Sequence, residues 1–183
     1  MSSLEDIKVS LDSNTNLDKE IKNKFYYLIT VLSNKFKGIN LDKLNKNIKT
    51  VSLGKISIFE RKGTYYYDVL ENKILFSKKI EGNYDIDHIL MKAILEMATS
   101  TGKFTGFSSD DRLRTLNLAY TEILANYIIG NEGDSDLEEE MLITNLLSHI
   151  VGKDTLFNAY FSNNGEPIIT AMKDSEVGLL WVV

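Results

Sequence analysis

The sequence predicts an α+β domain with an N-terminal helix, a small antiparallel sheet and a C-terminal helical bundle. Apolar residues recur every three to four positions near the N-terminus and through the C-terminal half, which is the period of an amphipathic helix. Between Ile48 and Ile80 the apolar period falls to two, which favours short strands. A chain of 183 residues suits one domain with its own hydrophobic core, so we expect residues 1–183 to fold as a unit.

Composition limits the classes of function. The formal net charge is −5, and the chain has neither a basic stripe nor a basic tail, so we expect no nucleic-acid partner and no membrane partner. The absence of cysteine excludes a disulfide, a thiolate nucleophile and a cysteine-type zinc site. The N-terminus lacks the pattern of a signal peptide, and no apolar run approaches the ~20 residues that cross a bilayer. We therefore expect a cytoplasmic protein.

The N-terminal part predicts one long helix after a loose start. Residues 1–14 are polar and mixed, and we expect a loose segment in which residues 7–11 could form a short edge strand. Residues 15–38 predict a helix that Asp12 or Ser13 could cap and that Gly38 ends. Its apolar stripe consists of Leu17, Ile21, Phe25, Leu28 and Leu32. A short helical turn is expected around Leu41 and Leu44.

Residues 48–80 predict the small sheet, as an antiparallel meander. The expected strands are 51–53, 56–59, 65–69 and 74–77, with turns at 62–63 and 71–73. Three adjacent tyrosines, residues 65–67, could form a binding face. Simple strand alternation is favoured instead, with Tyr65 and Tyr67 on one face of the sheet and Tyr66 on the other.

Residues 85–176 predict the helical part. Helices are expected at 85–100 and 112–129, joined by a loop at 101–111 in which Phe104 and Phe107 are anchors. The second helix is apolar over much of its circumference and should be central. The acidic run 130–140 lacks the ligand order of a calcium loop and is expected to be a solvated connection.

Shorter helices and an apolar tail complete the chain. We expect a helix at 141–151 closed by Gly152, a helix at 155–161 capped by Asp154, and a last helix opened by Pro167. The tail, residues 177–183, is apolar. It could pack back as a strand, form an interface in a homo-oligomer, or begin a further element.

Five segments, spread over roughly residues 65–172, together suggest a relationship. They are Lys73–Ser77, Ile89–Ser100, Gly106–Phe107, Leu116–Leu124 and Ile150–Phe161. In this order and spacing they resemble small zinc-metallopeptidase-like proteins of the gluzincin kind, whose strand, His-Glu-x-x-His helix, Gly-Phe pair, ligand helix and Ala-Tyr-Phe segment follow one another. The resemblance implies a minimal zincin-like fold.

The same resemblance implies that the catalytic site is degenerate. In the family the first histidine, the general base and the second histidine bind zinc and activate its water. Here Lys92, Ala93 and Glu96 occupy those three positions. Glu122 matches the third zinc ligand and is kept. We therefore expect no catalytic residue, no bound metal and no cofactor.

The chain has two histidines, and they are the weak candidates for a rebuilt metal site with Glu122. His88 shares a helix face with Lys92 and Glu96. However, His88 and Glu96 are separated by about 12 Å along a helix, at ~1.5 Å per residue. A single ion bound by His88, Glu96 and Glu122 is therefore not expected. His149 belongs to a different helix.

Two arrangements could account for Lys92. A carboxylate that has lost its metal needs another cation or a proton. The first hypothesis is therefore an internal ion cluster of Lys92 with Glu122, with Glu96 as a third member if it lies near. The alternative is an ordinary exposed ion pair between Lys92 and Glu96, four residues apart, which would contribute little to stability.

These observations favour a non-catalytic, metallopeptidase-like pseudoenzyme that binds an unidentified protein partner or supports an assembly. One alternative is a hydrolase that uses Glu96 or Glu122 as an acid or base, or a rebuilt metal site. The other alternative is a helical interaction module unrelated to peptidases.

Overall fold

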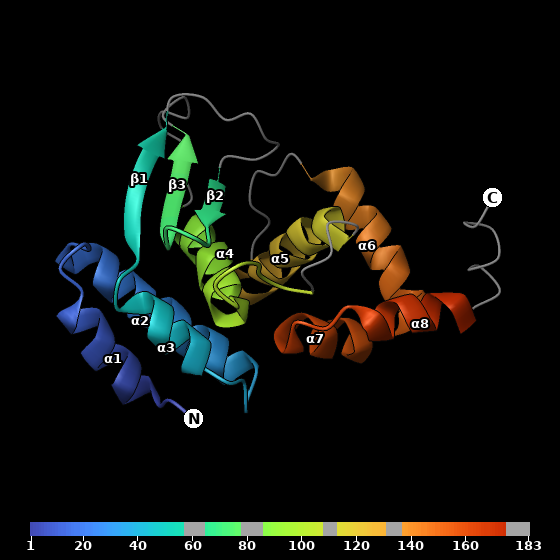
Figure 1. The fold of residues 1–183 in the computed structure, drawn as a ribbon, viewed down its shortest axis with the longest axis horizontal. Coiled ribbons are helices and arrows are strands. Elements are labelled where there is room, and N and C mark those ends of the chain that lie inside the picture. Colours follow the sequence, from blue (N-terminus) through green and yellow to red (C-terminus); the bar gives the residue numbers. More distant parts are fainter. Residues whose placement is uncertain (57–64, 78–85, 108–112, 131–136, 175–183) are drawn as a thin grey trace.

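The computed structural model describes residues 1–56, 65–77, 86–107, 113–130 and 137–174. Helices α1, α2 and α3 lie on one side and helices α5 to α8 on the other (Figure 1). Helix α4 lies between these two groups, below a small sheet. The fold is therefore α+β, as the sequence predicts. Among the described helices, none combines the length and apolar composition needed to cross a membrane.

The N-terminal segment is a helix. α1 spans Leu4–Ser13, and Ser3 and Asp6 form a capping box in which each side chain accepts a hydrogen bond from the other residue's backbone. Ile7 and Leu11, one turn apart, are both fully buried. The expectation of a loose segment at 1–14, or of an edge strand at 7–11, is therefore wrong. The cap and the apolar spacing of one helical turn prevail over the polar composition.

Helix α2 spans Lys19–Lys35 and confirms the predicted apolar stripe, although it begins later than the predicted helix at 15–38. Its N-cap is Asp18, whose carboxylate accepts a 2.9 Å hydrogen bond from the backbone of Ile21. The predicted caps, Asp12 and Ser13, lie instead within α1. Helix α3, Asp42–Ile48, confirms the short helix expected around Leu44.

The sheet is mixed rather than antiparallel. Among the described residues, strands β1 (Ser52–Ile56), β2 (Tyr65–Asp68) and β3 (Lys73–Ser77) pair in the order β1-β3-β2. β2 and β3 are antiparallel as predicted, whereas β1 runs parallel to β3. A meander assumes that neighbours in sequence pair with each other, and β1 instead pairs with the strand after next. The turn predicted at 62–63 lies outside the described residues.

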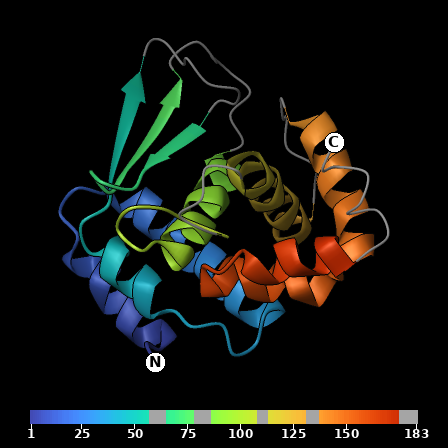
Figure 2. The same ribbon diagram turned by 45° about the vertical axis from the view of Figure 1, so that its right-hand side comes forward.

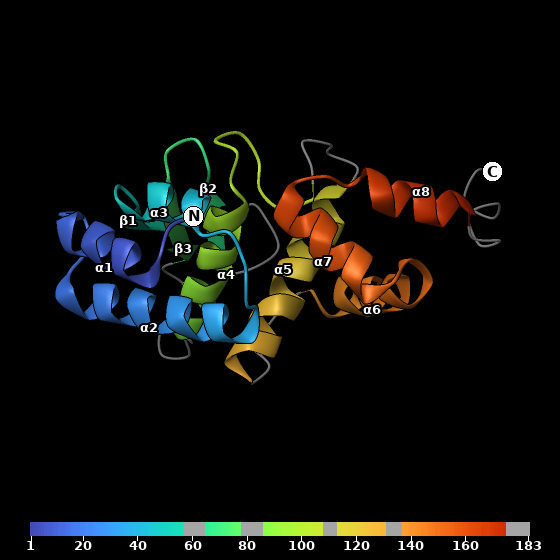
Figure 3. The ribbon, with the colours of Figure 1, turned by 90° about the horizontal axis from the view of Figure 1, so that it is seen from below.

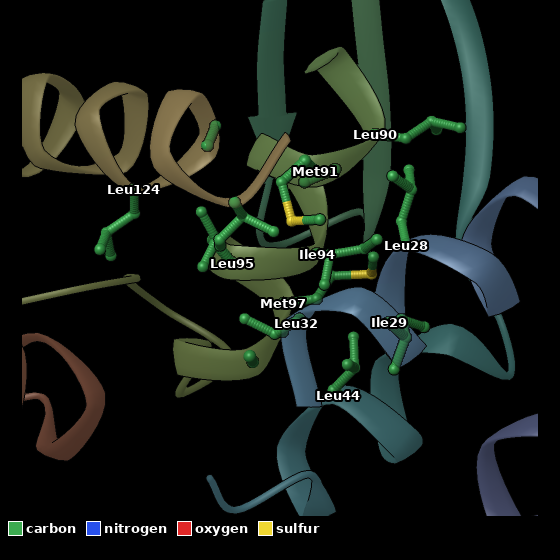
Figure 4. Close-up of a cluster of buried hydrophobic side chains, with 14 of the residues drawn as sticks. Leu28, Ile29, Leu32, Leu44, Leu90, Met91, Ile94, Leu95, Met97 and Leu124 are labelled. Carbon is green, nitrogen blue, oxygen red and sulfur yellow. The ribbon is translucent and has the colours of Figure 1, made fainter. Parts of the chain in front are cut away.

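Helix α4, Ile86–Thr99, is the centre of the core. All its residues from His88 to Thr99 are buried. Figure 4 shows side chains of α2 and α3 packed on one side of α4 and a side chain of α5 (Arg114–Ile129) on the other. The labelled contributors from these neighbours are Leu28, Ile29, Leu32, Leu44 and Leu124. α4 is therefore enclosed by its neighbours, and its polar side chains His88, Lys92 and Glu96 are buried together with its apolar ones.

The C-terminal helices are α6 (Glu138–Val151), α7 (Lys153–Ser162) and α8 (Glu166–Asp174). Gly152 separates α6 from α7, as predicted, but the predicted cap Asp154 lies in the first turn of α7 and makes no side-chain cap. Pro167 is the second residue of α8. α7 and α8 cross below α5 and α6 (Figure 2) and lie at the far end of the molecule from α1 (Figure 3). The tail at 177–183 and most of the acidic run lie outside the described residues.

Candidate functional site

The candidate site lies where α4 packs against α5. Lys92 of α4 donates a 2.9 Å hydrogen bond from Nζ to Oε2 of Glu122 on α5. Both residues are buried, with 8% of Lys92 and 1% of Glu122 exposed. The predicted ion pair between Lys92 and Glu122 is confirmed. Because the pair lies between two central helices, it joins them across the core.

The second oxygen of Glu122 faces a histidine. Nε2 of His88 lies 3.1 Å from Oε1 of Glu122 and 2.6 Å from Oδ1 of Asn126. The same ring nitrogen of His88 thus lies near two oxygen atoms, and the shorter of the two distances is that to Asn126. Oε1 of Glu122 accepts no hydrogen bond from the described residues. Its contact with the His88 ring is an electrostatic one. Of the two histidines considered as weak candidates, His88 therefore does reach Glu122.

Glu96 belongs to a different set of contacts. The hydroxyl of Tyr65 donates to Oε2 of Glu96, and the hydroxyl of Thr105 lies 3.4 Å from Oε1. Glu96 is 7% exposed. Burial raises the pKa of Glu96 to about 7, although the Tyr65 hydrogen bond and the Lys92 charge both favour the ionised form. This carboxyl group can therefore gain or lose a proton near neutral pH.

The Lys92 ammonium group, which is bonded to Glu122, also lies against the ring of Tyr65, the tyrosine that is bonded to Glu96. Nζ of Lys92 lies 5.2 Å from the centre of the Tyr65 ring, whose hydroxyl is bonded to Glu96. Burial, followed by the negative charge of Glu96, raises the pKa of Tyr65 well above its ordinary value. The hypothesis of an exposed Lys92–Glu96 pair is wrong, because both side chains are buried and the Lys92 ammonium is bonded to Glu122.

Hydrogen bonds connect the C-terminal end of α4 to the loop that follows it and to Asn163, the residue after α7. The side-chain amide of Asn163 donates to the carbonyls of Thr99 (2.5 Å) and Gly106 (2.7 Å). The N–H of Gly106 donates to the Thr99 hydroxyl at 2.9 Å. Gly106 has a φ of +67°, and a β-carbon there would lie 1.5 Å from Oδ1 of Asn117. Only glycine fits this approach, which explains the Gly106–Phe107 pair in structural terms.

The remaining candidate residues are placed differently. Ala93 is fully buried on α4, and its methyl group offers no proton acceptor. His149 is exposed in the last turn of α6 and does not belong to the cluster. The structure therefore brings together His88, Lys92 and Glu122, with Glu96 next to them. Within the described ranges, no group of three or more His, Cys, Asp or Glu side chains is placed to hold a metal ion.

Three contributors to the site were not predicted from the sequence as members of it. They are Tyr65, Thr105 and Asn126. Asn126 follows Glu122 by one helical turn, so its position on the same face of α5 was a usable signal. The inward direction of Tyr65 follows from its place on the same sheet face as the buried Tyr67, two residues further along the strand. Thr105 lies in a loop, and its sequence carries no signal for the contact.

In comparisons with protein-family models, with curated proteins and with solved structures, no match to this chain was found. The resemblance to gluzincin peptidases therefore stays a prediction.

Proposed function

We propose that this protein is a non-catalytic relative of gluzincin peptidases, in which the position of the metal is taken by Lys92. The protein would act as a structural or protein-interaction module rather than as a peptidase. The observation that carries the proposal is the buried 2.9 Å contact between Lys92 Nζ and Glu122 Oε2. Glu122 is the residue that the resemblance makes a metal ligand, and it already has a cation.

The charge at this position opposes a metal ion. A dication bound to Glu122 would lie within a few ångströms of the Lys92 ammonium, and like charges in a buried site repel strongly. A protonated lysine has no lone pair to offer a metal. Lys92 would have to lose its proton or leave the core before zinc could bind to Glu122.

The proton-transfer machinery of a peptidase also has no counterpart at the matching position. A general base must lie within hydrogen-bonding reach of the water that it activates. Ala93 stands where the resemblance places that base. The neighbouring carboxylates are already bonded, Glu122 to Lys92 and Glu96 to Tyr65. These contacts favour a role in holding the fold together.

Zinc titration of the protein and of a rebuilt variant tests the proposal. The native protein should retain below about 0.1 equivalent of zinc after excess metal is removed. The variant Lys92→His/Ala93→Glu/Glu96→His places two histidines one turn apart on α4, the first at the position that contacts Glu122, and should bind about one equivalent. Adding Glu122→Gln to this variant is the matched control and should weaken binding strongly.

Each outcome separates one of the hypotheses. Stoichiometric zinc in the native protein would refute the proposal and direct attention to His88 with Glu122. A folded triple variant that binds no zinc would refute the peptidase relationship and leave an unrelated helical interaction module. Zinc binding by the native protein tests the native site. Zinc binding by the triple variant tests the geometry of the α4–α5 pair.

One observation favours a second candidate function, a carboxylate-based hydrolase. Glu96 has a pKa of about 7 and accepts a hydrogen bond from Tyr65, and a carboxyl group with a raised pKa can act as a general acid or base. A hydrolase screen of the native protein with Glu96→Gln and Glu122→Gln as controls tests it. Activity that Glu96→Gln abolishes would favour this candidate over the first.

A further inference from the structure

Helix α6 presents its large apolar side chains outward. Leu142, Ile143, Leu146 and Ile150, which we name the α6 stripe, are 61%, 63%, 57% and 42% exposed. Leu142, Leu146 and Ile150 follow one another at intervals of one helical turn, so they form one continuous row about 12 Å long at ~1.5 Å per residue. The stripe is therefore a single surface rather than a scatter of exposed side chains.

The opposite face of α6 also carries apolar residues, with Val151 buried and Leu147 packed against the core, together with two hydroxyl groups. Thr144 and Ser148 are buried there, with 2% and 9% exposed. Each hydroxyl donates to a carbonyl of its own helix, Thr144 to Glu140 at 2.7 Å and Ser148 to Asn145 at 2.6 Å. A surface helix ordinarily turns its apolar residues to the core and its polar residues to water. α6 is apolar on its outward face as well as on its buried face, which indicates that the stripe is covered.

The chain carries an apolar segment of suitable composition shortly after α8 in the sequence. Every residue of 177–183 except Gly178 is apolar, and the segment carries no charged side chain. It follows α8, which ends at Asp174 and packs against α6. Nine residues, 175–183, can extend to about 30 Å at ~3.3 Å per residue, well beyond the length of the stripe. Residues 175–183 lie outside the described residues.

We infer that residues 177–183 bind to the α6 stripe of the same chain. In this contact, residues 177–183 would bury apolar surface on the four aliphatic side chains of the α6 stripe. Neither the segment nor the stripe contains a charged side chain that would be left unpaired. This interaction is independent of the proposed function, because the stripe is exposed on α6 whereas the contact between Lys92 and Glu122 is buried between α4 and α5.

The size of the stripe favours its own chain over a second copy. A stable complex between separate proteins uses roughly 20–30 residues on each side. Four side chains with their immediate neighbours fall well below that number. A tethered segment, by contrast, meets its site at an effective concentration in the millimolar range and does not lose the translational freedom of a separate partner.

Trp181 is the only tryptophan of the chain and reports directly on the inferred contact. Selective excitation of Trp181 should give blue-shifted emission and strong protection from acrylamide in the native protein. Leu146→Asp should shift the emission to the red and raise the quenching constant several-fold. Val9→Asp is the matched control, because Val9 is similarly exposed (61%) on α1, and it should change neither signal. Far-UV circular dichroism verifies that both variants are folded.

Two results would overturn the inference. One is native Trp181 emission and quenching equal to those of free tryptophan in water. The other is protection of Trp181 that disappears on dilution, with light scattering showing a dimer, because the occupant would then come from a second copy. Protection that is independent of concentration in a monomer, and that Leu146→Asp removes, supports the contact within one chain.

Discussion

Lys92 and Glu122 hold α4 and α5 together through a buried contact of 2.9 Å. Removing one partner leaves the other charge buried and uncompensated, whereas removing both does not. Lys92→Met should therefore lower the free energy of unfolding by about 3–5 kcal/mol. Lys92→Met/Glu122→Met should recover most of this loss. Chemical denaturation of the two single variants and the double variant measures the coupling, and additive losses would mean that the pair is not coupled.

Glu96 should make stability fall as the pH rises. Its pKa is about 7 in the folded protein, against an ordinary value of 4.5, so the folded state binds the extra proton more tightly. The corresponding stabilisation is complete below pH 4.5 and is lost as the pH rises through 7. Among the described residues, the charged and titratable groups that interact with Glu96 are Lys92, Tyr65, Tyr67 and Tyr160.

The variant Glu96→Gln isolates this effect, because the amide keeps the acceptor for Tyr65 and cannot ionise. The native protein should gain up to ~3 kcal/mol over Glu96→Gln as the pH falls from 7 to 4.5. Thermal or chemical unfolding at several pH values gives the difference. A difference that is constant across this range would contradict the assigned titration.

Gly106 should be intolerant of any side chain. Its φ is +67°, and the new methyl group of Gly106→Ala would overlap the Asn117 amide. We expect a loss of more than about 2 kcal/mol of stability, because conformational strain adds to a steric clash. Gly130→Ala is the matched control, since its φ of +87° is similarly strained but the space around it is open. Equal losses in the two variants would show that Asn117 does not matter.

The N-terminal helix should depend on its cap. The Ser3 hydroxyl accepts a hydrogen bond from the Asp6 backbone and donates to the Asp6 carboxylate. Ser3→Ala should cost about 1 kcal/mol of stability. Ser13→Ala, at the other end of α1, removes only a hydroxyl that donates to the Ser10 carbonyl, and should cost less than about 0.5 kcal/mol. Equal costs would argue against the capping box.

The parts of the fold that were predictable from the sequence are those whose signal is local. The apolar period of α2 and the apolar surface of α4 follow from residue spacing alone. The capping box of Ser3 and Asp6 is also a local signal. The prediction of a loose segment gave more weight to the polar composition of residues 1–14 than to this signal. The parallel pairing of β1 with β3 depends on residues distant in the sequence, so the period-two pattern identified the strands but not their partners.

The site divides in the same way. The Lys92–Glu122 pair was one of the two arrangements suggested for Lys92, because a buried carboxylate requires a compensating charge. The approach of Tyr65 to Glu96, from a strand to a helix, depends on how the sheet is placed over α4. The contact between His88 and Glu122 depends on how α4 and α5 cross, and helix periodicity does not specify this crossing.

The parallel pairing of β1 and β3 has a consequence for the order of assembly. β2 and β3 are joined by a short turn, so their hairpin closes a small loop at low entropic cost. Among the described strands β1 pairs with β3 alone, so β1 has no partner there until β3 is in place. The sheet should therefore grow outward from the hairpin, and β1 should be the last strand to join and the first whose amide protons exchange with solvent.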